Sequence, residues 1–102
     1  MIIIIVITYI VVEVRPIWKQ YEKSGGENSP RYRNEKLDVE LEIRYRSDIF
    51  DVENDTYIAS WDGERLSGNS AEELMDRISL CSGQMSENQY KWFEYILTHV
   101  VE

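Results

Sequence analysis

The chain contains a single cysteine, Cys81, and a single histidine, His99. One cysteine cannot form an intrachain disulfide, which excludes the stapled frameworks of small secreted domains and favours a reducing, cytoplasmic location. One cysteine and one histidine also argue against a zinc site, which takes several such ligands. A catalytic pair of Cys81 and His99 has no recognised local signature. We therefore expect a protein that is not an enzyme, with no catalytic residue, metal or cofactor.

Basic residues are scarce, above all in the later part of the chain. The sequence has 11 Lys and Arg against 19 Asp and Glu, and its formal net charge is −8. Bases outnumber acids in residues 1–36, whereas every charged side chain from Ser47 to Glu64 is acidic. Such a surface repels DNA and RNA and attracts a basic protein. Direct nucleic-acid binding is therefore not expected.

The one long apolar run, Met1–Val12, is too short to span a membrane as a helix, which needs about 20 residues. It also lacks the basic segment and the cleavage site of a signal peptide. Its β-branched residues favour an extended backbone. We expect a first strand over Ile2–Val14, ended by Pro16, and no contact with a membrane. The core residues expected from this strand are Ile5, Ile7, Tyr9 and Val11.

A polar stretch follows at residues 22–36, rich in glycine, serine and charged side chains. Turn formers such as Ser24-Gly25-Gly26 and Asn28-Ser29-Pro30 predict a long loop here. Arg31, Tyr32 and Arg33 form a basic-aromatic cluster that could stack on a base. Acids and bases are nearly balanced around it, so we interpret it as a charged loop.

Further strands are predicted after this loop. Apolar and polar residues alternate over Leu37–Arg46, which is typical of a strand with one buried face. Thr56–Trp61 has the composition of a strand, and a short one is expected at Glu64–Leu66 after the hairpin signal Asp62-Gly63.

Two helices are predicted at the end of the chain. Ser70 and Glu73 have the spacing of a capping box, in which each side chain accepts from a first-turn amide. Ser86 and Gln89 have the same spacing. Apolar residues recur at helical intervals after both boxes, and Gly83 is a plausible end to the first helix.

Because the helices follow the strands, the sequence predicts one α+β domain over residues 1–102. We expect a three- or four-stranded antiparallel sheet with two C-terminal helices packed on one face. The rest of the expected core is Val39, Leu41, Ile43, Ile58, Leu74, Ile78, Phe93, Ile96 and Leu97.

The acidic surface is the main candidate for function. Alternation over the predicted strand would set Asp38, Glu40 and Glu42 in line, about 6.5–7 Å apart, much like successive phosphates of a nucleic acid. The alternative is a surface that serves only solubility. A calcium loop over residues 51–62 is not favoured, because Thr56 stands where glycine is required. The expected partner-binding residues are Asp38, Glu40, Glu42, Asp48, Asp51, Glu53 and Asp55.

Two resemblances add to this interpretation. The segment Tyr57-Ile58-Ala59, Gly63 and Gly68–Leu74 resembles HicB-like antitoxins, in which a strand leads through glycines to a Ser/Thr-x-Glu-Glu helix start. The overall profile is similar to small phage-encoded inhibitors of bacterial defence of the anti-CRISPR type, which are often acidic single domains of this size.

The leading hypothesis is a non-enzymatic acidic protein that occupies a basic, nucleic-acid-contacting surface of a partner protein or nucleoprotein complex, as an anti-CRISPR-type inhibitor would. The alternative, implied by the first resemblance, is an antitoxin or regulatory partner that binds a small toxin. A homodimer through the apolar first strand is left open by the sequence.

Overall fold

The computed structural model of the chain describes residues 15–46 and 53–101. The strand expected over Ile2–Val14, with its four core residues, lies outside the described residues. The described elements, in chain order, are η1 (Ile17–Lys19), β1 (Glu22–Ser24), β2 (Arg31–Asn34), β3 (Val39–Arg44), β4 (Thr56–Trp61), β5 (Glu64–Gly68), α2 (Ala71–Leu80), η2 (Ser82–Gln84), α3 (Glu87–Tyr95) and η3 (Ile96–Val100).

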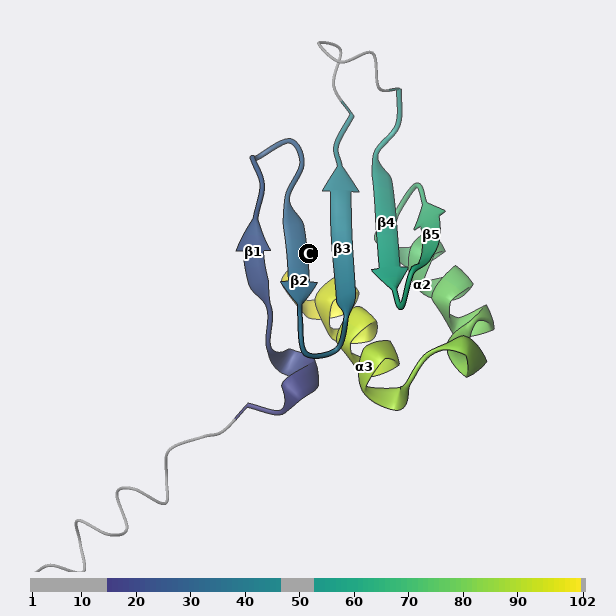
Figure 1. Cartoon of the computed structure of the whole chain (residues 1–102). Helices are drawn as coiled ribbons and strands as arrows, with labels where there is room; N and C mark the ends of the chain where they lie inside the picture. The colour runs from purple at the N-terminus through teal and green to yellow at the C-terminus, as the bar shows by residue number, and fades with distance from the viewer. Residues whose placement is uncertain (1–14, 47–52, 102) are drawn as a thin grey trace, which may run out of the picture.

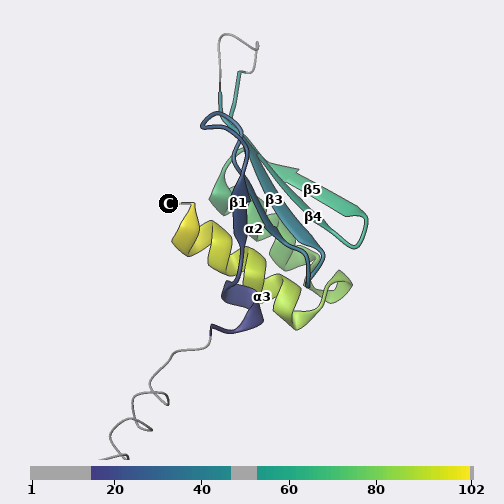
Figure 2. The ribbon, with the colours of Figure 1, turned by 60° about the vertical axis from the view of Figure 1, so that its left-hand side comes forward.

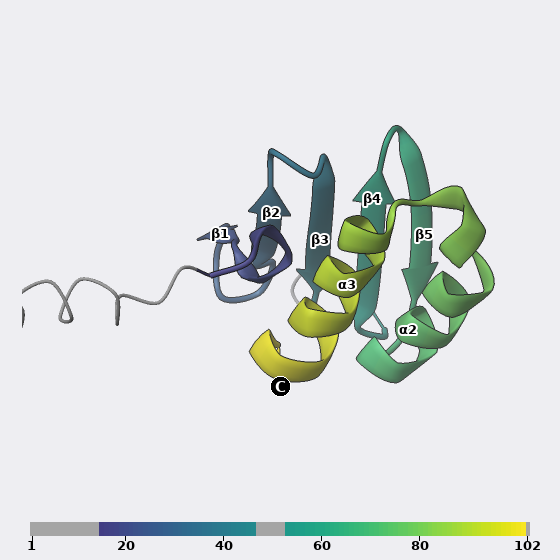
Figure 3. The ribbon, with the colours of Figure 1, turned by 90° about the horizontal axis from the view of Figure 1, so that it is seen from below.

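The strands form an antiparallel meander in the order β1-β2-β3-β4-β5 (Figure 1). Each strand pairs with its neighbour in the chain, and all connections except that between β3 and β4 are six residues or shorter. Figures 2 and 3 show α2 and α3 on the same side of this sheet. The predicted α+β class and the placement of the helices are confirmed, but the described sheet has five strands rather than three or four.

The central strand β3 has the predicted period of two. Val39, Leu41 and Ile43 are buried against the helices, and Glu40 and Glu42 between them lie on the other side of the sheet. The neighbouring strand β4 coincides with the predicted Thr56–Trp61 segment. These two strands share the longest pairing in the sheet, from Val39 opposite Trp61 to Arg44 opposite Thr56.

The long loop expected at residues 22–36 is wrong, because both ends of this segment are strands. β1 and β2 pair as a hairpin, and only residues 25–30 connect them. Gly25 has a φ of +82°, so the expected turn at the glycines is present. The hairpin escaped prediction because its buried side chains, Tyr32 and Asn34, are one aromatic and one polar residue rather than an aliphatic pair.

The β4–β5 hairpin and the helix starts follow their local signals. Asp62 and Gly63 both have positive φ, 47° and 82°, as a two-residue hairpin turn of type I′ requires. Ser86 and Gln89 form the complete predicted capping box at α3, with hydrogen bonds of 3.1 and 2.8 Å.

The first predicted capping box is only half formed. The Ser70 hydroxyl accepts from the Glu73 amide at 3.0 Å. The Glu73 carboxylate, however, accepts from the Asn69 amide at 3.3 Å instead of that of Ser70. α2 ends at Leu80, and the predicted stop Gly83 lies within the short helix η2 that follows.

The core lies between the sheet and the two helices. The expected core residues Val39, Leu41, Ile43, Leu74, Ile78, Phe93, Ile96 and Leu97 are buried there. Tyr32, Ala59, Trp61 and Trp92 belong to the same core and were not expected in it. Ile58 is buried as expected, but it alternates with Ala59 on β4 and so lies on the opposite face of the sheet.

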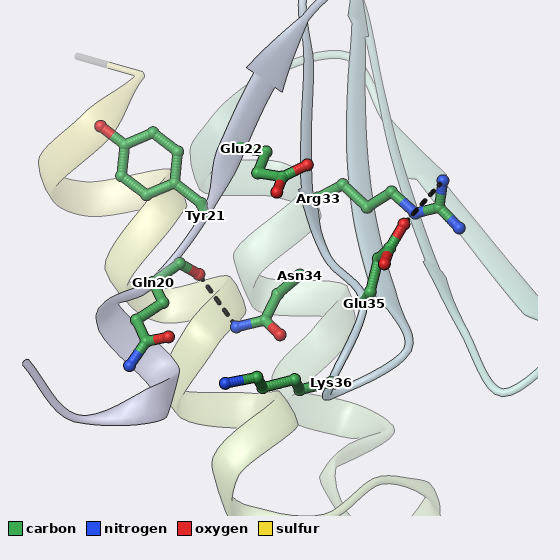
Figure 4. A pocket seen from close by; sticks show the side chains of 7 residues that line it. All are labelled: Gln20, Tyr21, Glu22, Arg33, Asn34, Glu35 and Lys36. Carbon is green, nitrogen blue, oxygen red and sulfur yellow. Dashed lines mark hydrogen bonds and ion pairs between the residues drawn. The ribbon is translucent and has the colours of Figure 1, made fainter.

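A buried asparagine attaches η1 to the sheet, and a tryptophan attaches it to α3. The Asn34 amide nitrogen donates to the carbonyls of Ile17 and Gln20, each at 2.9 Å, and its oxygen accepts from the Leu37 amide at 3.1 Å. Trp92 Nε1 on α3 also donates to the Gln20 carbonyl, at 2.9 Å. Figure 4 shows Asn34 reaching the Gln20 backbone at the edge of a polar pocket.

Gly68 is required by the close approach of β5 to α2. A Cβ placed there would lie 2.9 Å from the Leu74 backbone nitrogen, whereas one placed at Gly83 would meet nothing within 4 Å. We predict that Gly68→Ala lowers the free energy of unfolding by about 1–3 kcal/mol and that Gly83→Ala changes it by less than about 0.5 kcal/mol. Chemical denaturation of both variants measures this, and equal effects would contradict the packing described.

Candidate functional site

The face of the sheet turned away from α2 and α3 carries a cluster of charged side chains. Figure 1 looks onto this face, with both helices behind the strands. No helix among the described residues covers it. It holds a shallow hollow of about 300 Å³. We call this surface the open face; its central residues are Arg31, Glu40, Glu42, Arg44, Ile58, Ser60 and Arg65.

Strand register places opposite charges beside one another across the open face. Arg33 on β2 is paired with Glu40 on β3, and Arg31 with Glu42. The row through Glu40 continues to Ser60 on β4 and then to Arg65 on β5. Directly opposed charges of unlike sign stabilise a sheet, whereas like charges would destabilise it. The open face is therefore a set of rows in which arginines flank carboxylates.

Glu42 is the centre of these contacts. Its Oε1 lies 2.9 Å from Arg44 Nε and 3.7 Å from Arg31 Nη2, and its side chain is only 13% exposed. Arg31 Nη1 also lies 4.0 Å from Glu40 Oε1. Ile58, in register with Glu42, is 5% exposed on the same face. Long charged side chains can cover an apolar residue with their stems and keep their charged ends in water.

The acidic ladder expected from Asp38, Glu40 and Glu42 is only partly present. Glu40 and Glu42 lie on the open face as predicted. Asp38 does not extend their row, because it lies in the β2–β3 turn with a φ of 53°. Glu53 and Asp55 precede β4, at the other end of the sheet. Asp48 and Asp51 lie outside the described residues.

Sequence reasoning missed the arginines of the open face. Arg31 and Arg33 alternate around the buried Tyr32, which is a period-two signal too short to outweigh the neighbouring turn formers. Arg65 comes from the adjacent hairpin, and only strand pairing brings it near Glu40. The strands of this face carry four arginines, Arg31, Arg33, Arg44 and Arg65. They carry three glutamates, Glu40, Glu42 and Glu22, the last of which is paired with Arg33. The excess of acid therefore lies elsewhere on the chain.

Asp55 has a local structural role just before the start of β4. Its Oδ1 accepts from the Arg46 amide at 2.6 Å. Burial raises the pKa of Tyr57 above its ordinary value of 10.0, and the charges of Tyr45 and Asp55 raise it further. The hydrogen bond to Arg46 fixes the Asp55 carboxylate at the start of the strand.

Cys81 and His99, the two residues with side chains suited to nucleophilic or base catalysis, have different environments. Cys81 is a free, half-buried thiol at the C-terminal end of α2. His99 lies in η3, stacks on Tyr95 with ring centroids 5.5 Å apart, and shares a 2.7 Å hydrogen bond with Thr98 Oγ1. Across residues 15–46 and 53–101, no three His, Cys, Asp or Glu side chains are grouped so as to hold a metal ion.

A second pocket of about 300 Å³ lies beside β1 and β2 and is lined by polar residues (Figure 4). Its buried Asn34 is fully engaged with backbone groups, and Arg33 lies 3.9 Å from the Glu35 carboxylate. These contacts attach η1 to β2 and stabilise the turn that follows β2.

Comparison of the chain with protein-family models, with curated proteins and with solved structures finds no match. In the described part of the chain, no helix is both long enough and apolar enough to cross a lipid bilayer.

The two carboxylates of the open face should contribute unequally to stability. The Glu42 side chain is 13% exposed and forms ion pairs with two arginines. Glu40 forms one ion pair at 4.0 Å, and its side chain is 36% exposed. We predict that Glu42→Gln lowers the free energy of unfolding by about 1 kcal/mol and that Glu40→Gln lowers it by less than about 0.5 kcal/mol. Urea unfolding measures the difference; a larger loss at Glu40 would contradict these pairings.

Tyr57 predicts a loss of stability at alkaline pH. Because its pKa is raised in the folded state, its contribution to stability is complete below about pH 10 and is lost as the pH rises through the folded value. We expect the free energy of unfolding to fall less steeply above about pH 10 in Tyr57→Phe than in the wild type. Tyr21→Phe, at an exposed tyrosine, is the control. Identical profiles for wild type and Tyr57→Phe would refute this.

Proposed function

We propose that this protein is a non-enzymatic binding protein that attaches to a partner protein through the open face of its sheet. The observation that carries the proposal is the pairing of arginines with carboxylates across a sheet face that no described helix covers. Arginine is enriched at protein interfaces and among the residues that contribute most to binding. Planar guanidinium groups held beside carboxylates offer a partner both donors and acceptors at fixed positions.

The partner that we propose is a basic protein, of the kind that contacts nucleic acid. A net charge of −8 attracts such a protein over long range and repels nucleic acid itself. At contact distance, Glu40 would accept hydrogen bonds from the partner's basic groups, while Arg44 and Arg65 would bind its carboxylates. An inhibitor of the anti-CRISPR type would be a concrete case, recognised by charges of both signs rather than by acidic residues alone.

The antitoxin alternative has no independent support from the segment that suggested it. Gly63 belongs to the hairpin turn, and Gly68 allows α2 to approach β5. At the start of α2, Ser70 accepts from the Glu73 amide, and the Glu73 carboxylate accepts from the Asn69 amide just before the helix. These four residues of the resemblance thus each have a structural explanation. A HicB-like protein that binds a small toxin stays the alternative, and the identity of the partner distinguishes the two.

A pair of charge reversals tests the proposal. Tagged wild-type protein is first used to capture its partner from a lysate of the organism that encodes it. Affinity for that partner is then measured for Glu40→Lys on the open face and Glu72→Lys on α2, which change the net charge equally. We expect Glu40→Lys to weaken binding by about tenfold or more, because it removes a contact at the interface. Glu72→Lys should weaken it by less than about threefold, through the loss of long-range attraction alone.

The same measurement over a range of salt concentrations separates the two effects. Long-range attraction is screened by salt, so the small effect of Glu72→Lys should vanish at high ionic strength while that of Glu40→Lys persists. Equal losses for both variants at every salt concentration would exclude the open face as the docking surface. Capture of a partner that is neither basic nor in contact with nucleic acid would contradict the proposed class of partner.

A further inference from the structure

A pocket of about 360 Å³ lies where η1 packs against α3, away from the open face. Figure 2 shows η1 beside α3 on the helical side of the molecule. The volume falls within the range of small-molecule sites in proteins. The residues that line it are Trp18, Lys19, Lys91, Glu94, Tyr95 and His99.

Three rings form the apolar part of this pocket. Trp18 and Tyr95 meet edge to face, with centroids 6.0 Å apart and planes at 78°, so they form a right-angled corner. His99 stacks on Tyr95 with an angle of 19° between the planes. The fold fixes Trp18, because η1 is attached to the sheet through Asn34 and to α3 through Trp92. Tyr95 and His99 lie together because they are four residues apart on one helical face.

Two lysine side chains converge on the same rings. Lys19 Nζ lies 5.3 Å from the centroid of Trp18 and 5.9 Å from that of Tyr95. Lys91 Nζ lies 5.9 Å from the Trp18 ring and 3.1 Å from the Glu87 carboxylate. Glu94 is the one acidic residue that lines the pocket. The two ammonium groups thus lie over one aromatic surface, although Glu87 and Glu94 balance their charges in number.

We propose that this pocket binds a small planar aromatic anion. Its ring would pack in the corner between Trp18 and Tyr95, where ring faces and edges offer stacked and edge-to-face contacts. Its carboxylate or phosphate would lie between Lys19 and Lys91, whose ammonium groups are compact point charges suited to either anion. The ring supplies buried apolar area and the anion supplies orientation, so neither half alone should bind well.

The proposal concerns a different surface from the open face and does not depend on it. Lys23 provides a comparison within the same chain, since its Nζ lies 5.7 Å from the Tyr32 ring on the hairpin. At that position one lysine faces one ring, whereas the pocket collects two lysines and three rings. Lys23 is therefore a matched control for the loss of a lysine that lies over an aromatic ring.

Calorimetric titration of the full chain with five probes tests the proposal. AMP and salicylate each combine a planar ring with an anion; adenosine and phenol have the ring alone, and inorganic phosphate is the anion alone. We expect AMP, salicylate or both to bind at one molecule per chain. Each of the three partial probes should bind at least about tenfold more weakly than the complete one. Binding of AMP alone identifies a nucleotide phosphate as the ligand class, and binding of salicylate alone identifies an aromatic carboxylate.

Variants that keep the lysine stem but remove its charge complete the test. Lys19→Met and Lys91→Met should each weaken the binding of the complete probe by about tenfold, and Lys23→Met should leave it unchanged. If neither AMP nor salicylate binds the wild type, or if both pocket variants bind as the wild type does, the proposal is wrong. Either result would leave the open-face proposal as it stands, because that is tested by partner binding.

Discussion

The structure depends on a five-stranded sheet whose described helices all pack on one face. On that face, Trp92 and Phe93 meet edge to face and contribute to the closed core, so the side chains of β3 that point inward are fully buried. Gln89 on α3 connects the helix to two turns at the same end of the sheet, since its Nε2 donates to the Leu37 carbonyl at 2.8 Å and to Asp62 Oδ1 at 3.1 Å. Because strands alternate, the same packing turns every second side chain onto the opposite face. On that opposite face, strand register places arginines beside glutamates and so forms the arginine–glutamate rows.

Much of the fold could be predicted because its signals are local. The alternation in β3, the Asp62-Gly63 turn and the Ser86–Gln89 capping box each depend on residues within a few positions of one another. The β1–β2 hairpin could not be predicted in this way. Its buried Asn34 is stabilised by the carbonyls of Ile17 and Gln20, which lie 17 and 14 residues away in the chain.

The candidate site was predicted only in part, because some of its features depend on one strand and others on the pairing of several strands. That Glu40 and Glu42 share one exposed face follows from the alternation of a single strand. That Arg31 and Arg65 flank them follows from cross-strand register, which the sequence of one strand does not contain. A surface interpreted as purely acidic is therefore one of mixed charge, and this changes the kind of recognition that it favours. In the proposed function, net charge would act at long range, while the paired side chains would determine which partner fits at contact.

The molecule thus has two separate surfaces with different chemistry. The open face is broad, shallow and charged with both signs, which suits a protein partner. The pocket between η1 and α3 is small, aromatic and lined by lysines, which suits a small anion.

Arg77 lies at the edge of the sheet and donates to the Ser67 carbonyl at 2.6 Å along β5, the last strand of the described sheet. A side chain that occupies a backbone carbonyl in this way hinders the addition of a further strand there.

Carboxyl footprinting of the complex with the captured partner tests the central claim most directly. We expect Glu40 on the open face and Glu72 and Asp76 on α2 all to react with a carbodiimide in the free protein, because each is at least partly exposed. Partner binding through the open face predicts that Glu40 becomes protected while Glu72 and Asp76 keep their reactivity. Protection of Glu72 and Asp76, with Glu40 labelled as in the free protein, would contradict it.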